Sequence, residues 1–118
     1  MNTGSDRPPK AIRRALREAA ERAYEAEPHR ALVELAAAFD EWREQRLTSG
    51  DLTDRIHRFH DGPARDLWKK YNCAPIETVV AHAIVTNVVD RAAVSPDLLA
   101  YLQRAIRFYE ETDDRGTA

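Results

Sequence analysis

The stretch that decides the fold is Ile76–Arg91, with the sequence IETVVAHAIVTNVVDR. Its valines and isoleucines are compatible with a strand or a helix, because β-branched residues favour strands and are tolerated in helices. Length favours a helix, since the stretch is long for a strand and directly follows a proline. Apolar side chains would surround such a helix almost completely. We therefore predict an all-α fold in which Ile76–Arg91 is the central helix or lies at a subunit interface.

Apolar residues recur with helical spacing through most of the remaining chain, most clearly in a wide stripe after Pro28 that includes Leu32 and Leu35. The further predicted helices run from Pro9 to Ala26, from Pro28 past Trp42, from Asp51 to His60, from Ala64 to Tyr71, and from Pro96 to Glu111. We predict a single-domain bundle of about six helices over residues 9–112, with short middle helices that cross at steep angles. Residues 1–8 and 113–118 are predicted to be disordered.

Prolines, glycines and capping residues set the predicted boundaries. Pro28 fits the first position of a second helix, so the first two helices should form an antiparallel hairpin or a kinked pair. Gly62 and Pro63 should stop one helix and start the next, with Gly62 free to adopt positive φ and Pro63 at the first helical position. Thr48 or Ser49 should cap the helix predicted from Asp51 to His60.

Composition and charge limit the function. The 118 residues are 43% hydrophobic and 32% charged with a net charge of -2, which fits one domain and excludes a strongly basic polyanion binder. The one cysteine, Cys73, cannot form an internal disulfide, and the N-terminus lacks the apolar run of a secretory signal, so we predict a cytoplasmic protein. The longest apolar run, Val79–Val89, is too short to span a membrane.

The two ends of the chain carry opposite charges. A basic segment opens the first predicted helix and an acidic segment closes the last, each unfavourable for the dipole of its own helix. These segments are Lys10, Arg13, Arg14 and Arg17, and Glu110, Glu111, Asp113 and Asp114. The basic segment is either a solvated surface or an arm for an acidic partner or nucleic acid. We also hypothesise that the two segments meet, within one chain or between two.

His57 and His60 form the leading candidate site. Histidines spaced i, i+3 lie next to each other on a helix and can both bind zinc or another divalent metal. Asp61 or Asp54 could supply a third ligand, and so could His82 if the central helix packs nearby. The alternative is that no cofactor binds and that His60 is a structural residue held by a hydrogen bond.

The predicted orientation of His60 follows from its neighbours. Leu52, Ile56 and Phe59 have the i, i+4, i+7 spacing of one helix face, and His60 lies one turn after Ile56. We therefore predict that His60 points into the protein or a cleft. His57 is rotated by about 100° from Ile56 and should be half exposed.

Arg55 and His60 begin and end the sequence RIHRFH, which Asp61 follows. This Arg-x4-His pattern resembles the short motif of the HEPN helical superfamily, many of whose members cleave RNA. The resemblance implies that Arg55 and His60 bind and activate a phosphodiester at a dimer interface, where a base and a cation assist attack by the 2'-hydroxyl. It covers six residues, and Ile56 departs from the polar residue that the family usually has after the arginine.

The remaining motifs predict structure more than chemistry. The sequence contains no Walker, Rossmann, GxSxG or HExxH pattern. Cys73 is predicted to be a small structural residue in a turn, and His82 a hydrogen-bonded core histidine. The aromatic residues predicted to lie in the core or at helix seams are Trp42, Trp68, Tyr71, Tyr101 and Tyr109.

Two functions remain open. We predict a small protein-interaction or regulatory module of unknown biochemical activity. A narrow apolar stripe in the first helix and the apolar Ile76–Arg91 helix leave surface to cover, so we expect a homodimer or another protein as partner. The alternative is a His-dependent enzyme, either a HEPN-like ribonuclease or a metal-assisted hydrolase, that uses Arg55, His57 and His60.

Overall fold

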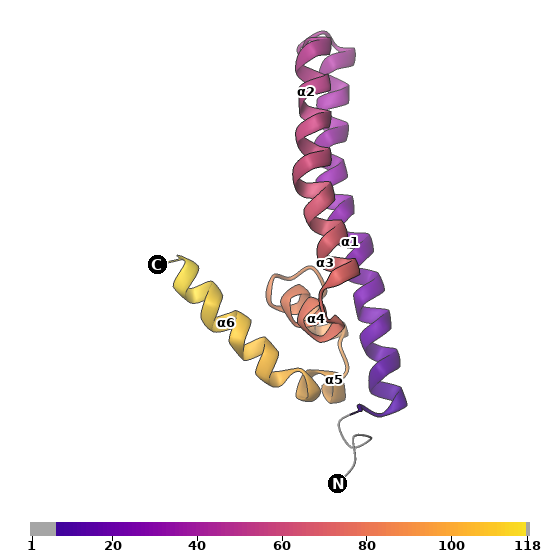
Figure 1. Cartoon of the computed structure of the whole chain (residues 1–118), viewed down its shortest axis with the longest axis vertical. Coiled ribbons are helices and arrows are strands. Elements are labelled where there is room, and N and C mark those ends of the chain that lie inside the picture. Colours follow the sequence, from indigo (N-terminus) through magenta and orange to yellow (C-terminus); the bar gives the residue numbers. More distant parts are fainter. Residues whose placement is uncertain (1–6, 118) are drawn as a thin grey trace. The chain divides into compact units, whose positions relative to one another are not determined.

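The computed structural model describes the backbone of residues 7–117 and the side chains of residues 7–112. It confirms the all-α prediction, since these residues form helices and turns and no strand (Figure 1). The helices are α1 (Lys10–Arg43), α2 (Ser49–Phe59), α3 (Arg65–Cys73), α4 (Ile76–Val85), α5 (Pro96–Tyr101) and α6 (Gln103–Thr117). No helix in this described part of the chain is both long enough and apolar enough to cross a membrane.

Contacts divide the chain into two compact units. We call Tyr24–Cys73 the hairpin, because it pairs the later part of α1 with α2 and α3. We call Met1–Ala23 together with Ala74–Ala118 the core unit. It combines the start of α1 with α4, α5 and α6.

Helix α1 runs without interruption through the predicted break at Pro28. The predicted antiparallel hairpin at Glu27 is therefore wrong, and a kink at Pro28 stays a prediction. Pro28 has no backbone N–H, so the carbonyl of Tyr24 loses its usual i+4 partner. The helix contains no glycine and many alanines, whose helix propensity compensates for one missing hydrogen bond.

Helices α2 and α3 are joined by a π-helical turn, His60–Ala64, and form one continuous rod. Gly62 and Pro63 do not stop the helix, so the predicted break is wrong, and Gly62 does not use the positive φ that is open to a glycine. In a π turn, each backbone N–H bonds to the carbonyl five residues back. Such a turn accommodates Pro63, which has no backbone N–H, within the helical path. The steep crossing predicted for the short middle helices is absent from this rod.

Side chains cap two of the helices. The hydroxyl of Thr48 accepts a hydrogen bond from the N–H of Asp51 at 3.0 Å, which confirms the predicted start of α2. The hydroxyl of Ser95 accepts one from the N–H of Leu98 at 3.2 Å and starts α5 in the same way. The last predicted helix is divided at Leu102, so that it forms α5 and α6.

Helix α4 supplies the centre of the core unit, as predicted. Its buried residues are Val79, Val80, Ala81, Ala83 and Ile84. The other buried residues of this unit come from α1, α5, α6 and the loop after α4: Leu16, Ala19, Ala23, Val89, Val94, Leu98, Leu102 and Ile106. Burial of each larger aliphatic side chain contributes about 1.5–3 kcal/mol, so this cluster is the main source of stability in the unit.

Helix α4 is nevertheless shorter than the predicted Ile76–Arg91 helix, because it ends at Val85. Asn87 adopts a φ of 62°, and the N–H of Val88 bonds back to the carbonyl of Ala83 at 2.8 Å. A residue in the left-handed region followed by such a bond closes a helix. Asparagine tolerates this conformation better than most residues, which explains the early end.

Aromatic contacts hold both ends of the hairpin. Where α1 leads into α2, the indole N–H of Trp42 donates a hydrogen bond to Oγ of Ser49 at 3.0 Å. At the opposite end, the rings of Tyr24 and Tyr71 stack with their centroids 4.6 Å apart. The hairpin is therefore fixed at its two ends by side chains of α1 and of the rod.

A carboxylate strengthens the end near Tyr71. Oε1 of Glu27 accepts hydrogen bonds from the ammonium of Lys70 at 2.7 Å and from the hydroxyl of Tyr71 at 2.6 Å. The side chains of Glu27 and Lys70 are 22% and 23% exposed, so solvent screens this ion pair less than a surface pair.

Charged residues of the basic and acidic segments form ion pairs with residues outside these two segments. Glu110 pairs with Arg91 at 3.1 Å, and Arg14 pairs with Glu18 at 3.6 Å. Among the described side chains, no ion pair joins the basic segment to the acidic segment. The side chains of residues 113–118 lie outside the description, so the meeting of the two segments and the disordered chain ends stay predictions.

Candidate functional site

The hairpin exposes large apolar side chains. Of its residues, all of which the structure describes, Ala38 and Leu52 alone are buried hydrophobic residues. Leu32 on α1 is 50% exposed, Ile56 on α2 is 39% exposed, and Trp68 on α3 is 57% exposed. Exposed apolar side chains that adjoin one another are typical of a binding surface.

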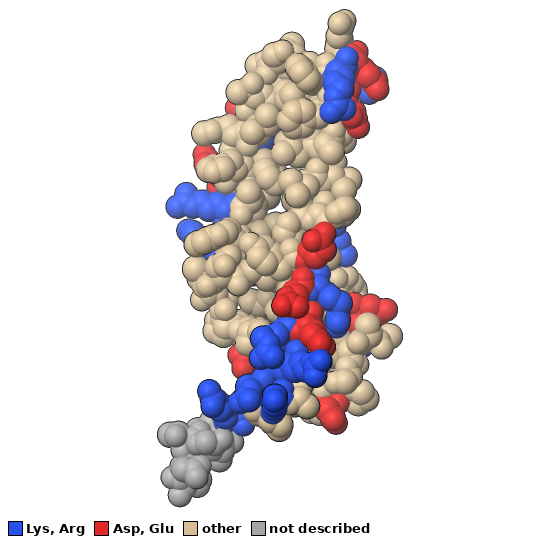
Figure 2. All heavy atoms as spheres, turned by 90° about the vertical axis from the view of Figure 1, so that its right-hand side faces the viewer, with Lys and Arg blue, Asp and Glu red and all other residues tan. Residues whose placement is uncertain are grey.

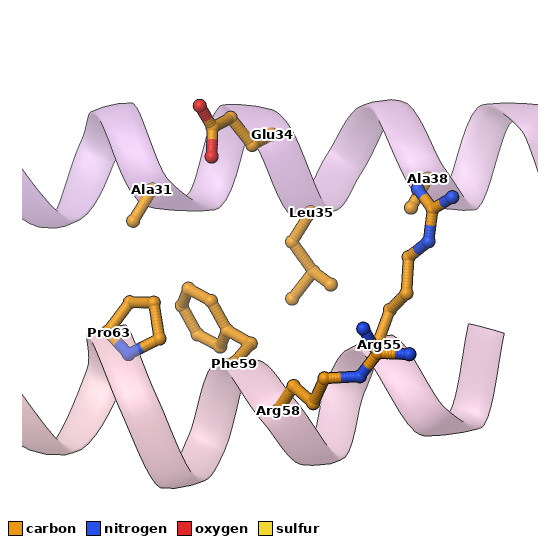
Figure 3. A pocket seen from close by; sticks show the side chains of 8 residues that line it. All are labelled: Ala31, Glu34, Leu35, Ala38, Arg55, Arg58, Phe59 and Pro63. Carbon is orange, nitrogen blue, oxygen red and sulfur yellow. The ribbon is translucent and has the colours of Figure 1, made fainter. Parts of the chain in front are cut away.

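The lining of a groove between α1 and the rod identifies the side chains on one flank of the hairpin (Figure 3). It has a volume of about 430 Å³, and its lining consists of Ala31, Glu34, Leu35, Ala38, Arg55, Arg58, Phe59 and Pro63. Leu35 and Phe59 point into the groove, and Arg55 reaches across it toward Ala38. Glu34 and Arg55 therefore mark one flank of the hairpin.

Leu32 and Ile56 lie on the opposite flank. Residues two apart in a helix are rotated by about 200°, so Leu32 points away from Glu34. On α2, Arg55 and Ile56 fall on either side of Phe59, which faces α1. Because Arg55 lies on the groove flank, Ile56 lies on the same flank as Leu32.

Trp68 belongs to this second flank as well. A smaller groove next to the first is lined by Asp66 and Leu67 together with Glu34. Trp68 is rotated by about 200° from Asp66 and so points away from that groove. We call Leu32, Ile56 and Trp68 the apolar face.

The apolar face carries little charge. Charged residues of the hairpin gather on the groove flank, where Glu34, Arg55, Arg58 and Asp66 line the two grooves. Figure 2 views the molecule from the right-hand side of Figure 1 and draws histidines in tan with the uncharged residues. In the upper half of this view, Lys, Arg, Asp and Glu side chains gather at the left edge and in a cluster at the upper right.

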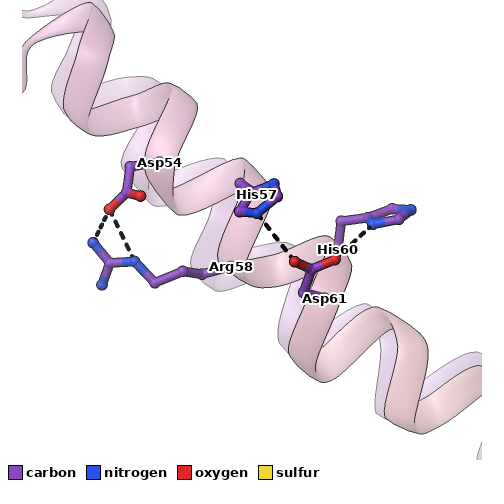
Figure 4. Close-up of polar contacts among 5 residues, drawn as sticks. All are labelled: Asp54, His57, Arg58, His60 and Asp61. Carbon is purple, nitrogen blue, oxygen red and sulfur yellow. Dashed lines mark hydrogen bonds and ion pairs between the residues drawn. The ribbon is translucent and has the colours of Figure 1, made fainter.

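Figure 4 shows how the predicted histidine site is arranged. Nε2 of His57 lies 3.1 Å from Oδ2 of Asp61, and Nδ1 of His60 lies 3.4 Å from Oδ1 of the same carboxylate. The side chains of His57 and His60 are 72% and 84% exposed. The prediction that His60 points inward is therefore wrong, because Phe59 takes the position that faces α1.

The predicted metal site gains no support from this arrangement. Among the described residues, no group of three His, Cys, Asp or Glu side chains is placed to hold a metal ion. The zinc site predicted at His57, His60 and Asp61 consequently stays a prediction. Asp61 interacts with both histidines, and this contact accounts for their proximity without a metal.

The predicted catalytic pair does not converge within one chain. Arg55 lines the groove between α1 and α2, whereas His60 projects into solvent. Residues five apart in an α-helix are rotated by about 140°, so the two side chains diverge. A phosphodiester held by Arg55 in the groove would not meet the imidazole of His60 of the same chain.

Replacing His60 by alanine should change the free energy of unfolding by less than about 0.5 kcal/mol, as for most exposed residues. Thermal unfolding of the full chain followed by circular dichroism would measure this. Arg65→Ala, on the same rod and also exposed, is the matched control. A loss well above that of the control would mean that His60 is packed against the protein after all.

Some aromatic residues that were predicted to lie in the core or at helix seams are exposed in the structure. Trp42 is 39% exposed, Trp68 57% and Tyr101 40%, so their assignment to the core is wrong. Tyr71 and Tyr109 are half-buried, as expected at a helix seam. The hairpin has too little covering structure to enclose its tryptophans.

Cys73 and His82, which were predicted to be structural residues, both lie in helices. Cys73 is the last residue of α3 and is exposed, so it lies in a helix and not in the predicted turn. His82 is half-buried on α4, and its ring meets the edge of Tyr109 with centroids 5.1 Å apart.

Sequence reasoning missed the apolar face. The sequence showed a wide apolar stripe after Pro28 that includes Leu32 and Leu35, but not which part of it is covered. One rod packed against α1 covers only part of a wide stripe, so Leu35 enters the groove while Leu32 stays exposed. The width of the stripe was the signal for a second packing partner.

Comparison with known proteins adds no relationship: no family model, no curated protein and no solved structure matches the chain.

Proposed function

We propose that the protein is a protein-interaction module that binds a helical partner through the apolar face of its hairpin. The observation that carries the proposal is the exposure of Leu32, Ile56 and Trp68 on one flank with little charge. Moving a side chain of this size out of water contributes about 1.5–3 kcal/mol, so a partner that covers all three gains considerable affinity.

The shape of the face suits a helix. Leu32 comes from α1, and Ile56 and Trp68 come from the rod beside it, so the apolar side chains flank the seam between two helices. Side chains along one face of a third helix can pack into such a seam, as ridges pack into grooves between helices. A partner helix with apolar residues at i, i+3, i+4 and i+7 meets this requirement.

An enzymatic function has no comparable support. Arg55 and His60 lie on different flanks, and the imidazoles of His57 and His60 stand in solvent beside Asp61. A general base and a cation act together only when both reach one reacting group. We therefore base the proposal on the apolar face.

The proposal retains the predicted cytoplasmic location. Cys73 is exposed at the end of α3. A reducing compartment keeps such a thiol free, whereas an oxidising one favours its pairing with another chain.

A displayed library of amphipathic helices tests the proposed function. The full chain should select helical peptides with an apolar stripe, and Leu32→Glu should abolish their binding because the new carboxylate would be buried beneath the peptide. Val33→Glu is the matched control, since Val33 is 54% exposed and is rotated by about 100° from Leu32.

Equal binding to the Leu32→Glu and Val33→Glu variants would contradict the proposal, as would a selection that yields no helical peptide. Circular dichroism of each variant would confirm that its helix content matches that of the unmodified chain.

A further inference from the structure

We infer that the partner of the apolar face is a second copy of the chain, so that two hairpins form a four-helix bundle. This inference rests on the proposed function, because it uses the same face. It adds the identity of the partner and the way in which the two hairpins meet.

The width of the face favours a partner with two helices. The part of α1 in the hairpin, Tyr24–Arg43, is about 30 Å long at 1.5 Å per residue, and packed helices lie about 8–10 Å apart. A two-helix face of these dimensions covers about 500–600 Å² on each copy. Two such faces bury about 1,100 Å² together, which is above the minimum of about 1,000 Å² for a biological interface and at the lower end of the size range. A single helix would cover only about half of this width.

The low charge of the face favours a partner of the same kind. A charged side chain buried without a partner costs free energy, so the partner surface must be nearly uncharged as well. The charged residues Glu34, Arg55, Arg58 and Asp66 line the grooves of the opposite flank, and the apolar face adjoins His60. Its pairing with another copy therefore brings Leu32, Ile56 and Trp68 together without burying these charged residues.

The three side chains of the apolar face lie at different positions along the length of the hairpin, with Leu32 between the other two. Lys70 and Tyr71 contact Glu27, so Trp68 lies near the Glu27 end. Arg55 and Phe59 share the groove with Leu35 and Ala38, so Ile56 lies near Ala38. Leu32 is placed between these two levels on α1.

In the dimer that we infer, a two-fold axis runs parallel to the helices of both hairpins. This symmetry places α1 of one copy opposite the rod of the other copy, at the same position along the hairpin. Leu32 then enters the space between Ile56 of the partner subunit and Trp68 of the partner subunit, where the partner's His60 also lies, one turn after Ile56 of the partner subunit, and the reverse contact forms by symmetry. A hairpin that buries little by itself thereby acquires the interior of a four-helix bundle.

Two variants test this arrangement in the full chain. Leu32→Glu and Ile56→Arg should each raise the dissociation constant of the dimer at least about tenfold, because each would bury a charge at the interface. Sedimentation equilibrium over a range of concentrations would measure this. Val33→Glu is the matched control and should leave the dissociation constant unchanged.

Mixing the two variants gives the decisive measurement. In an equimolar mixture, the carboxylate introduced at position 32 of one copy faces the guanidinium introduced at position 56 of the other, and the second pair of contacts remains apolar. The mixture should therefore contain a heterodimer that neither variant forms with itself. A defect in folding would not be repaired by mixing, so rescue identifies a contact between copies.

Three results would overturn the inference: a chain that is monomeric at every concentration, a dimer that Leu32→Glu and Ile56→Arg leave intact, or a mixture that stays monomeric. The proposed function fails on a different result. If the chain is monomeric but selected helical peptides still bind in a way that depends on Leu32, the interaction face stands and only the second copy is excluded.

Discussion

Replacing Ile84 by alanine should lower the free energy of unfolding of the core unit by about 2–5 kcal/mol. Ile84 is 1% exposed and lies on α4, which supplies most of the centre of this unit. Removing three carbon atoms there loses their transfer free energy and leaves a cavity that the surrounding helices fill only in part. Small domains are stable by about 5–15 kcal/mol, so the loss is a large share of the total.

Urea unfolding of the full chain, followed by circular dichroism, would measure the effect. Ile84→Val should cost only about 0.5–1.5 kcal/mol, and it keeps the series measurable if the alanine variant fails to fold. Phe108→Ala is the control in the same unit, because Phe108 is 62% exposed and truncation there should change little. Equal losses at Ile84 and Phe108 would show that α4 is not the centre of the core.

Replacing Glu27 by alanine should destabilise the hairpin by about 1–3 kcal/mol, the usual cost of leaving partly buried polar groups without their partner. The change removes the acceptor of both Lys70 and the hydroxyl of Tyr71. Hydrogen exchange of the α3 amides in the full chain would report the loss, because α3 carries both donors. Glu25→Ala, an exposed carboxylate on the same helix, should leave this exchange unchanged.

The same contacts make the hairpin sensitive to alkaline pH. Burial, followed by the hydrogen bond to Glu27, raises the pKa of Tyr71 well above its ordinary value of 10.0. The folded hairpin therefore holds this proton more tightly than the unfolded chain does, so the contribution of Tyr71 to stability is fully present below about pH 10 and is lost as the pH rises further. Tyr71→Phe should remove this part of the decline, as measured by urea unfolding at pH 8 and pH 11.

A decline that is identical in the Tyr71→Phe variant would assign the alkaline loss to other residues. Glu27→Gln offers a second check, because it removes the negative charge and should bring the pKa of Tyr71 closer to its ordinary value.

The periodicity of apolar residues predicted the all-α fold and the central place of α4, because burial depends on spacing that is visible in the sequence. Local signals also predicted the cap at Thr48. They failed at Pro28 and at Gly62–Pro63, where neighbouring helical residues and a π turn outweighed the usual effect of these residues. Proline and glycine are weak evidence for a break when the flanking segments each pack against a common helix.

The candidate site was predicted less well than the fold. The spacing of His57 and His60 did bring both imidazoles to Asp61, yet it could not tell which side of α2 faces α1. That orientation depends on the long-range packing of Phe59 against α1. For the same reason, the apolar stripe after Pro28 did not reveal that Leu32 is half exposed.

The core unit is built from two segments separated in sequence by the whole hairpin. Leu16 and Leu98, both buried in this unit, are therefore separated along the chain by the whole hairpin, whereas the contacts of the hairpin join residues that are closer in sequence. Closing long loops slows folding, so during synthesis the hairpin should form while the start of α1 still waits for α4 to α6 to leave the ribosome.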